Sequence, residues 1–194
     1  MWYRTYLSII CAFSLNTVSW SQTELPYKEI PSYPSIYTEG TVISRMIDGL
    51  GYRYYWATKA LRAKDLDFRP DTHARSIYET MEHIYGLSIM VLNASKNQVN
   101  QRADTSQMKV NDLRLATLEN LKLASEKISS LNNLEDFNIL FQNSSKRKTL
   151  PFWHVLNGPL ADAIYHTGQI VSFRRTSGNP MNSKVNVLMG KTDL

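Results

Sequence analysis

The stretch DAIYHTGQI, residues 162–170, carries the residue types best suited to chemistry. Asp162 and His166 are four positions apart, so on a helix they share one face, with Cβ atoms about 5–6 Å apart. Two side chains at this spacing can share one metal ion, as two histidines at i and i+4 do in zinc enzymes. On spacing alone, such a pair is more often a surface pair or an ordinary hydrogen bond.

A third candidate ligand, His83, lies beside the apolar stripe of a different amphipathic segment. If the two segments form neighbouring helices, His83, Asp162 and His166 can converge, as cofactor ligands do between the helices of bundles. Two imidazoles and one carboxylate leave coordination positions open for water or substrate, which is typical of catalytic metal sites. An ion held in this way can lower the pKa of a bound water or thiol, or polarise a carbonyl group.

Four amphipathic segments of roughly similar length would have to position these side chains. In each segment, apolar residues recur at the spacing of one helix face. The expected helices cover residues 39–62, 75–95, 110–131 and 150–178. This pattern predicts an all-α fold of the four-helix-bundle type.

Proline and glycine mark the boundaries of the last expected helix. Pro159 is expected either at the first helical position or at a kink. Gly178 and Pro180 predict the C-terminal end of the helix. A longer link at residues 132–151 contains DFNILF, which is compatible with a short strand.

The bundle is expected to occupy residues 37–180. An extended lead-in with three prolines precedes it at residues 22–36, and a polar, loosely held tail follows it at residues 181–194. Residues 1–21 combine one cation, a short apolar run and small residues before Gln22, which is the pattern of a cleaved secretory signal peptide. This pattern predicts a secreted or periplasmic protein with no stable membrane insertion after cleavage.

The composition and motifs of the sequence argue against several classes of function. The only cysteine, Cys11, lies in the expected signal peptide, so the mature chain would have no disulfide, thiolate ligand or cysteine nucleophile. The formal net charge is +5. The cations are scattered apart from the cluster at residues 146–148, expected to be a solvated loop, and this does not favour a nucleic-acid surface. A glycine-rich phosphate loop and a Ser–His–Asp signature are also missing from the sequence.

Three stretches together resemble the DinB/YfiT-like family of four-helix bundles. DAIYHTGQI, followed by arginines and SGNP, resembles the last helix of that family, and FRPDTHARSIYETMEHIYGL resembles its second helix. GLGYRYYWAT is similar to the first helix of a secreted branch. The resemblance covers about residues 37–180 and implies a divalent metal held by one histidine of the second helix and an HxxxH pair of the fourth. The matching residues are His83, Asp162 and His166, with an aspartate where the family has a histidine.

Four further side chains are candidates for a supporting role around the metal. Glu79 could orient His83, and Gln169 could hydrogen-bond a bound ligand. His154 could act as a donor, although a packing role is expected. Arg174 could clamp an anionic group or pair with Asp48, although its place near a helix C-terminus is the simpler explanation.

These observations predict a divalent-metal-dependent enzyme that acts on a small molecule outside the cytoplasm. The resemblance implies hydrolase-like or thiol-transferase-like chemistry, with zinc, nickel, iron or manganese as the ion. The alternative is a non-catalytic metal- or ligand-binding bundle. A third possibility is an interaction scaffold with an exposed aromatic face on the first helix. A homodimer is compatible with the sequence but not required by it.

Overall fold

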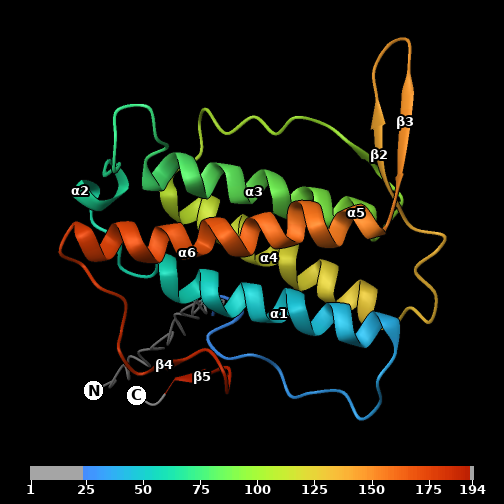
Figure 1. Ribbon diagram of the computed structural model, residues 1–194, viewed down its shortest axis with the longest axis horizontal. Helices are drawn as coiled ribbons and strands as arrows, with labels where there is room; N and C mark the ends of the chain where they lie inside the picture. The colour runs from blue at the N-terminus through green and yellow to red at the C-terminus, as the bar shows by residue number, and fades with distance from the viewer. Residues whose placement is uncertain (1–23, 193–194) are drawn as a thin grey trace, which may run out of the picture.

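The computed structural model describes residues 24–192, and this part of the chain is mostly helical (Figure 1). It contains four long helices, α1 (Glu39–Thr58), α3 (Ile77–Ala94), α4 (Val110–Ser129) and α6 (Ala161–Thr176). Helices α1 and α3 each pack against both α4 and α6, so the core lies among all four. The expectation of a mainly helical domain is confirmed. No helix of the described residues is long and apolar enough to cross a membrane.

Two small sheets correct the all-α expectation. Strands β1 (Val99–Asn100), β2 (Asn138–Gln142) and β3 (Arg147–Pro151) form one sheet, in which β1 is parallel to β2 and β2 is antiparallel to β3. The short strand expected within DFNILF is therefore present, because Ile139 and Leu140 are apolar and buried. The cluster at residues 146–148 is exposed as expected, but two of its members belong to β3 rather than to a loop.

Local sequence explains where the helices begin and what they bury. Thr38 and Ser76 form capping boxes at the starts of α1 and α3, satisfying backbone N–H groups that have no partner within a helix. The aromatic residues of α1 face inward, with Tyr52, Tyr54 and Trp56 almost fully buried. Helix α1 therefore does not present the exposed aromatic face that an interaction scaffold would require.

Both ends of the described chain pack onto α1. The hydroxyl of buried Tyr27 donates to Asp48, and Gly51 lacks a side chain where a Cβ would overlap the Tyr27 ring. Near the C-terminus, β4 (Val185–Asn186) pairs with β5 (Lys191–Thr192), and the Tyr52 hydroxyl lies 2.6 Å from the Lys191 carbonyl oxygen, to which it donates. The expectation of a loosely held tail is therefore wrong for the residues up to Thr192, which are paired and held against α1. The expected signal peptide lies outside the described residues.

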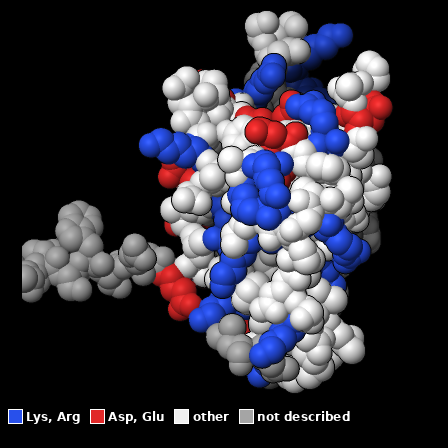
Figure 2. Space-filling model, turned by 90° about the vertical axis from the view of Figure 1, so that its left-hand side faces the viewer, with Lys and Arg blue, Asp and Glu red and all other residues white. Residues whose placement is uncertain are grey.

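A buried carboxylate ties the short helix α2 (Ala63–Leu66) to the end of α6. Asp65 is fully buried and accepts hydrogen bonds from Arg62, Ser177 and Asn179. Figure 2 shows this end of the molecule, with lysine and arginine side chains spread over it and a small group of acidic side chains among them. The Arg62 guanidinium, together with these donors, holds the pKa of Asp65 well below its usual range.

Asp65→Asn is expected to lower the melting temperature at pH 7 by several degrees. A folded-state pKa below the unfolded value means that Asp65 stabilises the fold above the unfolded pKa of about 4, and that this stabilisation is lost as the pH falls further. The wild-type protein should therefore lose stability more steeply than Asp65→Asn below about pH 4. Thermal unfolding of both proteins between neutral and acidic pH checks this, and two parallel curves would contradict it.

Candidate metal centre

A distorted turn immediately before α6 sets the position of the candidate ligands. The short helix α5 (Trp153–Val155) continues into a π-helical turn, η1 (Leu156–Leu160), and then into α6. Pro159 lies inside this turn, and Gly158 has φ −94° and ψ −111°, outside the helical range. Proline cannot donate the i→i−4 hydrogen bond, and its ring clashes with the preceding turn. The kink expected as one of two alternatives at Pro159 is therefore the one observed.

His83 on α3 meets Asp162 and His166 on α6. The distance from His83 Nε2 to Asp162 Oδ2 is 3.0 Å, and His166 Nε2 lies 3.3 Å from Asp162 Oδ1. One ligand atom from each residue can be chosen so that all three lie within 4.8 Å of one another. The rings of His83 and His166 meet edge to face, with centroids 4.6 Å apart. The helices that carry the predicted ligands are thus neighbours, and the three side chains converge.

The donor atoms suit a small divalent ion. Zinc binds imidazole nitrogen and carboxylate oxygen at about 2.0–2.2 Å, so neighbouring ligand atoms of such an ion lie about 3.0–3.5 Å apart. Asp162 Oδ2 lies 3.0 Å from His83 Nε2 and Asp162 Oδ1 lies 3.3 Å from His166 Nε2, so each carboxylate oxygen is within this range of one imidazole nitrogen. This arrangement could hold a metal, and the donor types are compatible with zinc, nickel, iron or manganese.

Gln169 contacts His166 in an arrangement that suits a metal-binding imidazole. His166 Nδ1 lies 2.6 Å from Gln169 Oε1. With the amide in this orientation, only the ring nitrogen can donate, so Nδ1 carries the proton and Nε2 of a neutral imidazole turns its lone pair toward Asp162. A lone pair facing a carboxylate is unfavourable unless a proton or a metal ion lies between them. Histidines that bind metals characteristically donate their other ring N–H to an acceptor of this kind.

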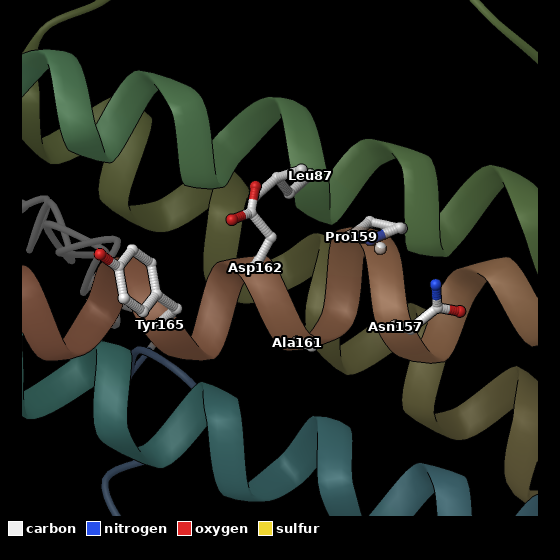
Figure 3. Close-up of a pocket in the computed structure, with 7 residues that line it drawn as sticks. Leu87, Asn157, Pro159, Ala161, Asp162 and Tyr165 are labelled. Carbon is white, nitrogen blue, oxygen red and sulfur yellow. The ribbon is translucent and has the colours of Figure 1, made fainter.

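The centre is open to solvent on one side. The side chain of Asp162 is 42% exposed and that of His83 29% exposed, whereas that of His166 is only 11% exposed. A hollow of about 500 Å³ adjoins Asp162, which points from α6 toward α3 (Figure 3). Its lining consists of Leu87, Asn157, Gly158, Pro159, Ala161, Asp162 and Tyr165. Of the three candidate ligands, Asp162 is the one that lines this hollow.

Of the four supporting candidates, the structure brings Gln169 to His166. Glu79 is occupied elsewhere: it caps α3 by accepting from the Ser76 N–H, and it pairs with Arg69. His154 is exposed on α5, so the expected packing role is wrong, and it is not part of the three-residue group. A regular helix would place His154 about two turns before Asp162. The π-helical turn between them breaks this regularity, so the two side chains do not lie as the sequence spacing suggests.

Arg174 is also engaged away from the centre, and it does not pair with Asp48. Its guanidinium donates to the carbonyl oxygens of Trp56, Ala57, Lys59 and Asn179, at 2.7–3.1 Å. These bonds cap the C-terminus of α1 rather than holding a substrate. Arg174 therefore does lie near a helix C-terminus, as expected. However, the carbonyl groups to which it donates are at the end of α1, not of its own helix α6.

Sequence reasoning missed the walls of the hollow. Tyr165 is 64% exposed and lines the hollow. It follows Asp162 by three positions on α6. Leu87 lines it from α3, one turn after His83. The i, i+3 and i, i+4 spacings from the candidate ligands could have identified both residues. The contribution of Asn157 depends on η1, which the sequence does not reveal.

Gln169→Leu is expected to weaken metal binding at least tenfold. Loss of the acceptor at His166 Nδ1 frees the ring to rotate and to change tautomer, and partners of this kind typically contribute 10- to 100-fold in affinity. Competition with a coloured chelator measures the change. Gln169→Glu retains an acceptor and serves as the matched control. Equal affinities in wild type and Gln169→Leu would show that Gln169 does not orient a ligand.

Comparison of the chain with models of known protein families and with curated proteins finds no match in either. Membership of the DinB/YfiT-like family therefore stays a prediction from the stretches quoted above. What the centre can do follows from its own donor atoms, their separations and their exposure.

Proposed function

We propose that this chain is a metal-dependent enzyme of the DinB/YfiT-like type, in which His83, Asp162 and His166 hold a divalent ion. The observation that carries the proposal is the convergence of two imidazoles and a carboxylate beside an open hollow. Among the described residues the group contains no fourth ligand. Three protein ligands with free positions are typical of catalytic sites, whereas structural zinc sites are closed by four.

The residues around the ion support chemistry on a small molecule. The ion would supply Lewis acidity, activating a water or thiol, or polarising a carbonyl group. Gln169 orients His166, and the carboxylate of Asp162 lies between the two imidazoles. Leu87 and Pro159 offer apolar contacts to a substrate, while Tyr165 and Asn157 offer polar groups at the rim of the hollow.

Hydrolysis is the better candidate of the two reaction types. The N-terminal sequence predicts export, and low-molecular-weight thiols are scarce in oxidising compartments outside the cytosol. A thiol transfer would lack its co-substrate there. We therefore propose hydrolysis of a small ester, amide or lactone in the periplasm or outside the cell.

A non-catalytic metal-binding role is the second candidate. The observation that favours it is the contact of Asp162 with both imidazoles, at 3.0 and 3.3 Å, which makes a compact and self-contained group. In this role the ion would stabilise the contact between α3 and α6. Such a protein would bind metal but show no turnover.

The proposed enzyme is expected to hydrolyse some members of a panel of esters, amides and lactones only when loaded with metal. Product formation is followed for the wild type with metal, the wild type with chelator, and His83→Ala. Activity should fall to background in the last two samples, because the ion or one of its ligands is missing. Full metal loading without turnover on any substrate would favour the non-catalytic role, and turnover unaffected by chelator would contradict both.

A further inference from the structure

A second and larger cavity lies away from the metal centre, at the N-terminal end of α1. Its volume is about 630 Å³, within the 300–1,000 Å³ typical of small-molecule sites. The N-terminus of α1, the segment after α4 and the junction of β3 with α5 and η1 enclose it. Its lining residues are Tyr37, Thr38, Glu39, Val42, Ile43, Leu134, Glu135, Pro151, Phe152, Trp153 and Leu156. It shares none of these with the hollow beside Asp162.

The walls of this cavity are mainly apolar and include three aromatic side chains. Phe152 is 6% exposed and belongs to the core, but Trp153 is 76% exposed and Tyr37 is 95% exposed. Val42, on the α1 side of the cavity, is also 45% exposed. Large apolar side chains gathered at a concave site, rather than scattered singly, mark a surface that binds a partner or ligand.

Within residues 24–192, the charged side chains that line the cavity are both carboxylates. Glu39 and Glu135 both belong to it, and its lining contains no lysine, arginine or histidine, although the chain as a whole has a net charge of +5. Glu39 Oε2 accepts a hydrogen bond from the Leu134 N–H at 3.2 Å, which fixes the position of this carboxylate. The local charge is therefore opposite in sign to that of the whole molecule.

The helix terminus next to the cavity does not oppose a cation. A helix N-terminus favours anions through its free N–H groups and its dipole. Here the Thr38 side chain accepts from the Thr41 N–H, the Thr38 carbonyl accepts from the Val42 N–H, and Glu39 supplies a negative charge in the first turn. The chain itself thus compensates part of the positive end of this helix.

We propose that this cavity binds a small organic cation with an apolar body, such as an aryl- or alkylammonium compound. Aromatic faces attract cations through the ring quadrupole, and quaternary ammonium groups are recognised by aromatic side chains in this way. Glu39 and Glu135 provide the opposite charge, while Phe152, Ile43 and Leu156 accommodate the apolar part of the ligand. This site is independent of the metal centre and of the function proposed for it.

The test compares three probes of similar shape and different charge on the full chain. Phenyltrimethylammonium, its neutral carbon isostere tert-butylbenzene, and the anion benzoate are titrated by calorimetry or competition. The cation is expected to bind about tenfold more tightly than the neutral isostere. Equal binding of cation and isostere, tighter binding of benzoate, or no binding of the cation at millimolar concentration would each overturn the proposal.

Variants locate the binding within the molecule. Trp153→Ala should weaken it about tenfold, and Glu39→Gln combined with Glu135→Gln should weaken it by a similar factor. The glutamine at position 39 can still accept from the Leu134 N–H, so the fold should be retained, which circular dichroism checks. Glu119→Gln removes an exposed charge on α4 outside the cavity and should leave the affinity unchanged. A loss of affinity in Glu119→Gln equal to that in the double variant would show a general charge effect and overturn the assignment.

Discussion

Asp162→Ala is expected to abolish stoichiometric metal binding while leaving the fold intact. Asp162 is the only residue of the group that contacts both imidazoles, at 3.0 and 3.3 Å, and the only one that supplies negative charge. Without it, two imidazoles remain, that of His83 on α3 and that of His166 on α6. The side chain is 42% exposed, so its loss should change the free energy of unfolding by only about 0.5 kcal/mol.

Titration with cobalt(II), followed by its visible absorption, measures this effect directly. Asp162→Asn keeps the shape of the side chain and removes its charge, so it should bind more weakly than the wild type but more tightly than Asp162→Ala. Asp162→His creates the HxxxH pair implied by the DinB/YfiT-like resemblance, and it is expected to keep one equivalent of metal. Stoichiometric binding by Asp162→Ala would remove Asp162 from the ligand set.

Arg174→Ala is expected to lower the free energy of unfolding by about 3 kcal/mol, because it leaves buried carbonyl groups of α1 without donors. Arg174 is only 3% exposed and donates to three carbonyl oxygens at the end of α1, at 2.8–3.1 Å. The carbonyl groups at a helix C-terminus have no partner within the helix, and burial without a donor is costly. The same side chain also donates to Asn179, which stabilises the chain reversal after α6.

Denaturant unfolding followed by circular dichroism gives the size of this effect. Arg175→Ala is the matched control, since Arg175 is the exposed neighbour in the same helical turn and should change stability by about 0.5 kcal/mol or less. Arg174→Lys keeps the charge but cannot reach all of these carbonyls and should lie between the two. Equal stability of Arg174→Ala and Arg175→Ala would show that the bonds to α1 do not stabilise the fold.

The geometry of the centre could be predicted largely because it depends on local spacing. Asp162 and His166 share a helix face by their four-residue separation, and the apolar stripe next to His83 predicts that this face lies against the rest of the domain. Neighbouring positions of α3 and α6 then bring the three side chains together. Gln169 follows from the same rule, three positions after His166.

Features that depend on distant parts of the chain could not be predicted in this way. Arg174 contacts residues more than 110 positions earlier, and Tyr52 holds a C-terminal hairpin about 140 positions later. Neither partner can be recognised from local periodicity. The same holds for Glu79, because its proximity to His83 along the sequence gave no information on the competing bonds to Ser76 and Arg69.

The π-helical turn is the local feature that mattered most and was only partly foreseen. A kink at Pro159 was one of two expectations, but the sequence predicted neither the conformation of Gly158 nor the widened turn. This turn separates the two cavities: Leu156 lines the one near α1, and Asn157 and Pro159 line the one beside Asp162. Turns of this type often occur at functional sites.

The metal content of the native protein shows whether His83, Asp162 and His166 hold an ion. The chain is purified without chelator or metal-affinity resin and analysed by elemental mass spectrometry, alongside His83→Ala. We expect about one equivalent of a divalent transition metal in the wild type and none in the variant. An absence of metal in the wild type, even after reconstitution with zinc, nickel, iron and manganese, would contradict this expectation.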